Sequence, residues 1–120
     1  MKNKVNILII GIVYLTTLFA QNNRYLDEVF DEVIKTENVV YGNAPDLPFL
    51  FWVESNTVDI DLDMDVYEPA GDTLTNRPVI IFAHTGSFFS GHNETDDMVN
   101  LAKSAAKRGY VAISINIPFI

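Results

Sequence analysis

The sequence predicts an α/β fold in which strands flank one amphipathic helix. Three observations support this class. Residues 58–66 alternate strictly between apolar residues and aspartates, and residues 79–83 form an uninterrupted apolar run. Residues 95–108 place apolar side chains at helical spacing, and a second apolar run follows at 110–115. A strand, a helix and a strand in this order are typical of a right-handed βαβ unit with parallel strands.

The first 20 residues have the features of a secretory signal peptide. Lys2 and Lys4 precede an apolar centre at residues 7–15, and the small residue Ala20 stands before the expected cleavage point. The centre is shorter than the roughly 20 residues that span a membrane. We therefore expect a secreted or periplasmic protein whose mature part is residues 21–120, without a stable membrane anchor. An uncleaved anchor is the alternative.

Charge and composition exclude several classes of partner. The 120-residue chain has a net charge of −8, and removal of residues 1–20 leaves six basic and sixteen acidic residues, a net charge of −10. Nucleic acids and anionic membranes are poor partners for such a chain, because binding them depends on lysine and arginine near phosphates. The sequence contains no cysteine, so no disulfide stabilises the exported protein.

The segment before the alternating strand gives mixed signals. Apolar residues at helical spacing within 26–34 indicate a helix, whereas residues 39–41 are rich in strand-forming side chains. We expect a short helix or an extended lead-in, followed by a strand. Residues 42–48 contain two prolines and are predicted to form a loop. The aromatic cluster at residues 49–53 either packs in the core or forms a contact surface for a hydrophobic substrate or partner.

The alternating strand, residues 58–66, places its apolar side chains on one face of a sheet and its carboxylates on the other. We expect the carboxylate face to be solvated. A calcium loop of the EF type is not expected, because Met64 stands where such a loop needs a turning glycine. The two histidines do not add a compact ligand pattern, so no metal site is predicted.

The helix and the last strand follow a polar loop at residues 71–77 and the apolar run at 79–83. Asn93 or Thr95 is expected to cap the helix, and Gly109 to end it. The sequence Asn93-Glu94-Thr95 is also a formal acceptor for N-glycosylation. The core face of the helix is predicted to consist of four residues: Met98, Leu101, Ala102 and Ala105.

Four segments between residues 39 and 116 resemble the α/β-hydrolase superfamily, in particular its secreted carboxylesterase and lipase-like branch. They are Asp65-Val66-Tyr67-Glu68-Pro69, the run from Arg77 to Gly91, the run from Ala106 to Val111, and Ser114-Ile115-Asn116. In that family a strand carries an HGGG-type loop that forms part of the oxyanion hole. The resemblance implies the N-terminal part of a hydrolase sheet, consisting of an antiparallel hairpin and one βαβ unit.

The resemblance assigns roles to the loop after the apolar run. It implies that the backbone amides of Gly86 and Ser87 stabilise an oxyanion, that His84 and Thr85 support the loop, and that Phe88 and Phe89 line an apolar pocket. Thr85 replaces the first glycine of the usual motif, and a β-branched residue is unfavourable at positive φ. An ordinary tight turn after the strand is the alternative.

The rest of the catalytic machinery has no counterpart in these residues. The family's nucleophile lies in a G-x-S-x-G motif, which the sequence lacks. We therefore expect the N-terminal fragment of a secreted serine hydrolase of carboxylic esters. It would contribute no nucleophile, acid or base and need no cofactor, and its unpaired strand edge would promote aggregation. The alternative is a non-catalytic secreted remnant or a small binding module that uses residues 49–53.

Overall fold

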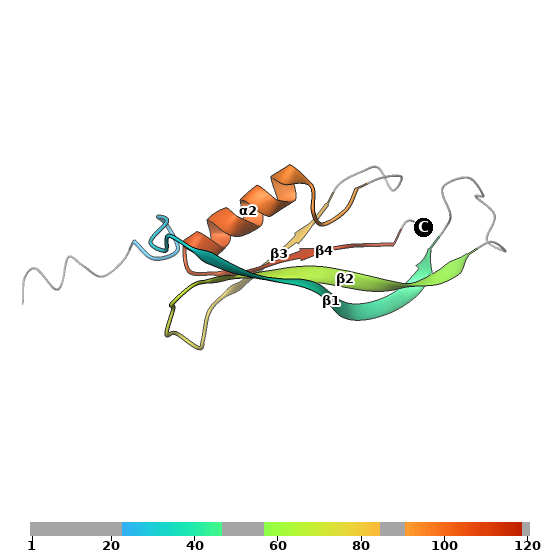
Figure 1. Ribbon diagram of the computed structural model, residues 1–120, viewed down its shortest axis with the longest axis horizontal. Helices are drawn as coiled ribbons and strands as arrows, with labels where there is room; N and C mark the ends of the chain where they lie inside the picture. Colours follow the sequence, from blue (N-terminus) through green and yellow to red (C-terminus); the bar gives the residue numbers. More distant parts are fainter. Residues whose placement is uncertain (1–22, 47–56, 85–90, 119–120) are drawn as a thin grey trace, which may run out of the picture.

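The computed structural model of the protein describes residues 23–46, 57–84 and 91–118. These residues form a four-stranded mixed sheet with one helix on one of its faces (Figure 1). The elements in chain order are β1 (Val33–Asp46), β2 (Val58–Pro69), β3 (Val79–Ala83), α2 (Asp96–Lys107) and β4 (Val111–Ile115). The α/β class predicted from the sequence is thus confirmed.

The strand order in the sheet is β1-β2-β4-β3. β2 pairs antiparallel with both β1 and β4, whereas β3 pairs parallel with β4. The chain leaves β3, forms α2 across one face, and returns as β4 beside β3, which is the βαβ unit that the sequence predicts. β1 and β3 are therefore the two edges of the described sheet.

The segment before β1 is an extended lead-in, not the helix that apolar spacing indicates. Its backbone donors bind the C-terminal end of α2: the Tyr25 N–H donates to the Arg108 carbonyl over 2.8 Å, and the Val29 N–H donates to the Lys107 carbonyl over 2.9 Å. Leu26, which would belong to the apolar face of a helix, is exposed. One local turn remains, in which the Leu26 and Asp27 N–H groups donate to the Asn23 carbonyl over 3.0 and 2.8 Å. It does not continue as a helix, because a helix this short has little stability of its own.

The loop predicted for residues 42–48 is wrong over its first part, since residues 42–46 continue β1. Ala44 pairs with Ile60, and Pro45 pairs with Asp59. A proline lacks a backbone donor and is tolerated in an edge strand, where one side of the backbone has no neighbour. Residues 47 and 48, like the aromatic cluster at 49–53, lie outside the described residues.

The predicted helix is confirmed, and its buried side differs from the prediction by one residue. Thr95 occupies the N-cap position, but its side chain makes no capping hydrogen bond, so the expected side-chain cap is not formed. Gly109, with φ of 97°, follows the C-cap Arg108. Leu101 is more than half exposed. The side chains of α2 that are buried are Met98, Ala102, Ala105 and Ala106. Small alanines let the helix approach the sheet closely, so that Ala102 and Ala106 surround the fully buried Tyr67.

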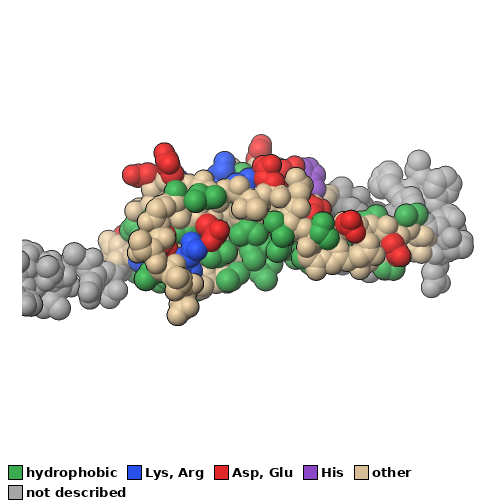
Figure 2. Space-filling model, turned by 60° about the horizontal axis from the view of Figure 1, so that its bottom comes forward, with side chains coloured by type: hydrophobic (Ala, Val, Ile, Leu, Met, Phe, Trp, Pro, Cys, Tyr) green, Lys and Arg blue, Asp and Glu red, His purple; other side chains and the backbone are tan. Residues whose placement is uncertain are grey.

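The two faces of the sheet differ in how they are covered. Alternate residues of β2, among them Asp65 and Tyr67, face α2, and both are at most 1% exposed. No described residue covers the opposite face, where Ile34, Val79 and Ile81 are 53%, 55% and 61% exposed. Figure 2, in which the lower side of Figure 1 comes forward, shows hydrophobic side chains gathered over this face.

This arrangement corrects the expectation that the carboxylates of β2 are all solvated. Asp59 and Asp61 are exposed, but Asp63 is half-buried and Asp65 is buried. β2 has 12 residues, and α2 with the segment before it covers only the C-terminal half of the strand. Within the described ranges, no helix has the length and apolar character needed to cross a bilayer.

Candidate functional site

The carboxyl ends of the parallel strands β3 and β4 lie side by side. Ala83 pairs with Ile115, so His84 and Asn116 leave the sheet at the same end. His84 is 8% exposed and Asn116 is partly buried. In open α/β sheets, ligands bind at the carboxyl ends of the strands. This end of the sheet is therefore where a functional site is expected.

Only one of the predicted site residues falls within the described part of the chain. His84 is buried at the end of β3, at the start of the predicted loop. The remaining predicted residues lie outside the described ranges, so their roles stay predictions: Thr85, Gly86, Ser87, Phe88 and Phe89. The predicted signal peptide, residues 1–20, lies outside them as well.

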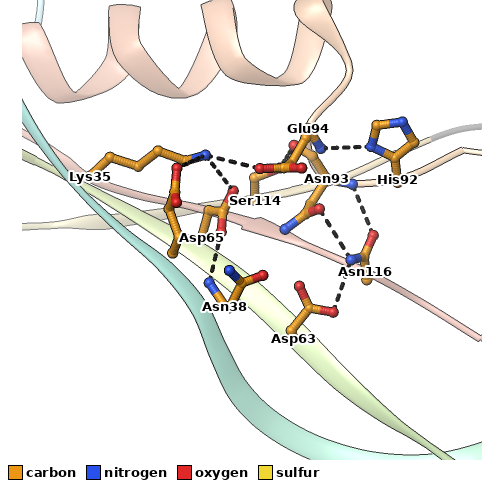
Figure 3. A network of polar contacts seen from close by, with 10 residues as sticks. Lys35, Asn38, Asp63, Asp65, His92, Asn93, Glu94, Ser114 and Asn116 are labelled. Atoms are coloured by element: carbon orange, nitrogen blue, oxygen red, sulfur yellow. Dashed lines mark hydrogen bonds and ion pairs between the residues drawn. The ribbon is translucent and has the colours of Figure 1, made fainter.

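The chain after this loop is bound firmly to the end of β4. The Asn93 N–H donates to Asn116 Oδ1 over 2.8 Å, and Asn116 Nδ2 donates back to Asn93 Oδ1 over 3.1 Å. Ser114 Oγ donates to the Asn93 carbonyl over 2.9 Å. Figure 3 shows these side chains converging between α2 and the sheet. Asn93, only 3% exposed, is thus held through both its backbone and its side chain.

Asn116 connects this contact to the two strands beyond β4. Its side-chain Nδ2 also donates to Asp63 Oδ1 over 3.0 Å, and its backbone N–H donates to the Asp63 carbonyl over 3.0 Å. The Tyr41 hydroxyl of β1 donates to the Asn116 carbonyl. Every polar group of Asn116 therefore has a partner, and the partners come from three different parts of the fold.

Lys35 of β1 makes a second connection to the same segment. Its Nζ lies 3.0 Å from Asp65, 2.9 Å from Glu37 and 3.2 Å from Glu94. Partial burial by itself would lower the pKa of Lys35, but hydrogen bonds to these three carboxylates outweigh burial and raise that pKa well above its usual range. Lys35 is therefore cationic at neutral pH.

The buried carboxylate of Asp65 is compensated from two directions. Lys35 supplies the opposite charge, and the Asn38 backbone N–H donates to Asp65 Oδ1 over 3.1 Å. Asn38 has φ of 56°, within a bulge of β1 that turns this amide toward the carboxylate. A buried charge without such partners would cost several kcal/mol. The ring of the neighbouring Tyr67 lies under Lys35, and burial raises the pKa of the Tyr67 hydroxyl.

Together, two carboxylates of β2 support two consecutive residues after the loop. Asp63 reaches Asn93 through Asn116, and Asp65 reaches Glu94 through Lys35 (Figure 3). We call these residues the β2 anchor. It fixes the position at which the chain re-enters the folded body, immediately before α2. Its lysine, carboxylates and amides hold one another through ion pairs and hydrogen bonds, so its contribution is to position the neighbouring backbone.

His92 shapes the turn that leads into α2. His92 Nδ1 accepts a hydrogen bond from the Glu94 N–H over 3.2 Å, which uses this nitrogen to shape the turn before α2. Among residues 23–46, 57–84 and 91–118, no group of three or more acidic, histidine or cysteine side chains is arranged to hold a metal ion.

Reasoning from sequence missed most of the β2 anchor. It assigned Asn93 to helix capping or glycosylation and treated Asp63 and Asp65 as solvated. The alternating aspartates were a signal, because two carboxylates on one face of a strand can serve donors from neighbouring strands. Lys35, however, lies 30 residues before Asp65 in the chain, and no local pattern joins them.

No protein-family model matches the chain, and comparisons with curated proteins and with solved structures find no match. The functional argument therefore depends on the geometry of the sheet end and on the motifs in the sequence.

Proposed function

We propose that this chain is the N-terminal part of a secreted serine hydrolase of carboxylic esters, and that it supplies the oxyanion loop after β3. The observation that carries the proposal is that the residues at both ends of that loop are held in place by the fold. His84 is buried where β3 ends, and Asn93 is held to Asn116 where β4 ends. An oxyanion hole needs donors that are fixed before the reaction, since reorganisation at the moment of reaction would cost part of their effect.

The strand order supports the same proposal. The resemblance implies an antiparallel hairpin followed by a βαβ unit whose first strand lies outside the second, next to the strand that carries the nucleophile. The described sheet has the hairpin β1–β2 and the unit β3–α2–β4, with β3 at the edge. The outer edge of β3 is free among the described residues to receive that further strand.

The chemical contribution of the chain is then electrostatic. The N–H groups of Gly86 and Ser87 donate to the oxygen that becomes negative in the transition state, and each such donor stabilises it by about 3–4 kcal/mol. Phe88 and Phe89 form an apolar wall for the acyl or alcohol group of the ester. Nucleophile, acid and base come from sequence that these 120 residues do not include, and no cofactor takes part.

A first test reads the nucleotides that follow the codon of residue 120 in all three frames. We expect a G-x-S-x-G sequence, followed by an aspartate and a histidine. The 120-residue chain alone should hydrolyse a short nitrophenyl ester no faster than background. Absence of the motif in every frame would leave the hydrolase proposal without a nucleophile. Activity of this chain by itself would instead contradict the statement that its nucleophile lies outside these residues.

A second test uses the completed protein and separates the backbone of the loop from its side chains. Ser87→Pro removes one amide donor and should lower kcat about 100- to 1,000-fold with little change in KM. Ser87→Ala keeps the amide and removes only the hydroxyl, so it should retain the activity of the unmodified enzyme. Equal losses in the two variants would contradict an oxyanion role for the amide.

The long hairpin favours a second candidate function, a non-catalytic secreted binding module. β1 and β2 extend beyond the part of the sheet that α2 covers (Figure 1), and residues 49–53 belong to the connection between them. Replacing the aromatic residues of this connection by serine should abolish binding by such a module. The hydrolase proposal predicts that the same replacement leaves the oxyanion-binding amides after β3 in place.

A further inference from the structure

The sequence Asn93-Glu94-Thr95 is the only acceptor sequence for N-glycosylation among the 120 residues, and the proposed function does not use it. N-linked glycans are bulky and polar, so the asparagine that carries one normally lies on an exposed segment. Asn93 is only 3% exposed, although Glu94 beside it is exposed and Thr95 is half-buried. The residue that would carry the glycan is therefore the buried member of its acceptor sequence.

The side chain of Asn93 points inward, between α2 and the sheet (Figure 3). Its Nδ2 atom, to which a glycan would be bonded, is buried, and its Oδ1 atom accepts from Asn116 Nδ2 over 3.1 Å. The hydroxyl of the fully buried Ser114 donates to the Asn93 carbonyl over 2.9 Å. Protein atoms thus surround the amide, and a sugar bonded to Nδ2 would have to displace α2 or the end of β4.

The backbone of the acceptor sequence also takes part in the fold. The Asn93 N–H donates to Asn116 Oδ1 over 2.8 Å, where β4 ends. The Thr95 carbonyl accepts from the Val99 N–H over 3.0 Å, in the first turn of α2. A transferase has to enclose the acceptor asparagine in its own active site, so residues 93–95 must leave the fold before transfer.

We propose that Asn93 is an N-glycosylation acceptor that becomes available only when the β2 anchor opens. In the transfer, Asn93 Nδ2 forms a bond to the anomeric carbon of a lipid-linked oligosaccharide. The bond between that carbon and the lipid diphosphate breaks, the diphosphate leaves with the electron pair, and Nδ2 loses one proton. The closed anchor therefore protects the site, and an unfolded or opened chain presents it. This inference uses only the anchor residues and does not depend on the hydrolase proposal.

Asn116 is the residue on which the closed state depends most. It binds both the backbone N–H and the side-chain oxygen of Asn93, and its Nδ2 also donates to Asp63 over 3.0 Å. The other hold on the acceptor sequence is the ion pair of Lys35 with Glu94, over 3.2 Å, which lies at the surface. Exposed ion pairs contribute little to stability, so the hydrogen bonds of Asn116 are the contacts to remove in a test.

A transfer reaction with purified components tests the proposal. The folded full chain is incubated with a single-subunit eukaryotic oligosaccharyltransferase and its lipid-linked oligosaccharide, and mass spectrometry identifies the modified residue. Thr73→Asn is the control, because it creates a second acceptor sequence at residues 73–75, in the exposed loop between β2 and β3. In this variant we expect transfer to residue 73 and none above background to Asn93. A short peptide of residues 91–97 should be modified at Asn93.

Asn116→Asp distinguishes burial from other causes of poor transfer. It removes the hydrogen bonds from Asn116 Nδ2 to Asp63 and Asn93, and it leaves the acceptor sequence unchanged. Transfer to Asn93 should rise about tenfold or more over the unmodified chain, because transfer follows the population of the opened anchor.

Three results would overturn the proposal. They are equal transfer to residues 73 and 93 in the folded Thr73→Asn chain, a peptide of residues 91–97 that is not modified, and an Asn116→Asp variant without a gain. If residue 73 is not modified in the folded chain either, the comparison of Asn116→Asp with the unmodified chain decides.

Discussion

At the scale of single residues, the protein stabilises a buried charge and two asparagines within one small region. Asp65 is 1% exposed and binds Lys35 and the Asn38 amide, while Asn116 uses every polar group it has. Buried polar groups are tolerated only while their hydrogen bonds and ion pairs are all formed. Removing one partner leaves the other group buried without a hydrogen bond, which lowers the stability of the protein. Substitutions that change one atom should therefore have large effects here.

Asp65→Asn is expected to destabilise the protein by about 1.5–3 kcal/mol, since it removes the charge-assisted contact with Lys35, which keeps Glu37 and Glu94 as partners. The side-chain oxygen of the asparagine can still accept a hydrogen bond from the Asn38 N–H, so the loss of stability measures the contribution of the negative charge. Urea denaturation at one protein concentration measures it. Asp59→Asn, at an exposed position of the same strand, should change the free energy of unfolding by less than about 0.5 kcal/mol. Similar values for the two variants would contradict the compensated burial of Asp65.

Asn116→Asp tests the β2 anchor with the smallest possible change. The new carboxylate still accepts from the Asn93 N–H, but it cannot donate to Asp63 or to Asn93 Oδ1, and it places a like charge beside Asp63. We expect a loss of about 2–3 kcal/mol in the free energy of unfolding. Hydrogen exchange should also become faster for the backbone amide of Asn93. Unchanged exchange at this amide would show that Asn116 does not hold the segment.

At the scale of elements, the end of α2 determines how closely the lead-in and β4 can pack. Gly109 has φ of 97°, in the region that favours glycine, and directs the chain from the helix into β4. A Cβ atom at this position would lie 2.8 Å from Arg24 Nε, so Gly109 also allows the lead-in to cross the turn. One residue thus serves both the helix end and the contact with the N-terminal segment.

Gly109→Ala should therefore cost about 1–3 kcal/mol, the usual range for a residue held in a sparsely populated backbone conformation. Gly42→Ala is the matched control, because a Cβ at Gly42 would meet nothing within 4 Å. Its effect should stay below about 1 kcal/mol. Thermal or urea denaturation of the two variants gives the comparison, and an equal loss in both would show that backbone strain at Gly109 is unimportant.

At the scale of the whole molecule, an ion pair joins segments that lie far apart in the sequence. Arg24 Nη1 and Nη2 donate to the two carboxylate oxygens of Asp72 over 3.0 and 2.5 Å, and Nη2 also donates to the Gly109 carbonyl over 3.2 Å. The pair connects the lead-in, the loop between β2 and β3, and the turn after α2. The hydrogen bonds from Arg24 lower the pKa of Asp72 below its ordinary value of 3.8.

The lowered pKa predicts the direction of one pH dependence. Because the folded state favours the charged form of Asp72, this stabilisation is fully present above the ordinary pKa of about 4 and is lost as the pH falls through the folded-state pKa. Asp72→Asn should therefore reduce the difference in free energy of unfolding between pH 6 and pH 2. Urea denaturation at the two pH values tests this. An unchanged difference would exclude a contribution of Asp72 to acid sensitivity.

The strand edges and faces also belong to this scale. One face of the sheet has a helix and a polar anchor, whereas the other has exposed Ile34, Val79 and Ile81. No described residue covers this apolar face, and faces of this kind are typical of surfaces that bind another segment or partner. The hydrolase proposal gives the edge at β3 a partner, a further strand of the same enzyme.

The sequence by itself determined the elements that have a clear period: the alternating strand, the two apolar strands and the amphipathic helix. These patterns reflect local geometry, which repeats every two residues in a strand and every 3.6 in a helix. Only the tertiary structure decided that the lead-in is extended, that β1 continues to Asp46, and that α2 covers the face with Asp63 and Asp65. Alternation shows which side chains share a face of the sheet. Which face is covered, however, depends on where a distant segment crosses over the sheet. The partners of a buried aspartate likewise come from other strands, so no local pattern reveals them.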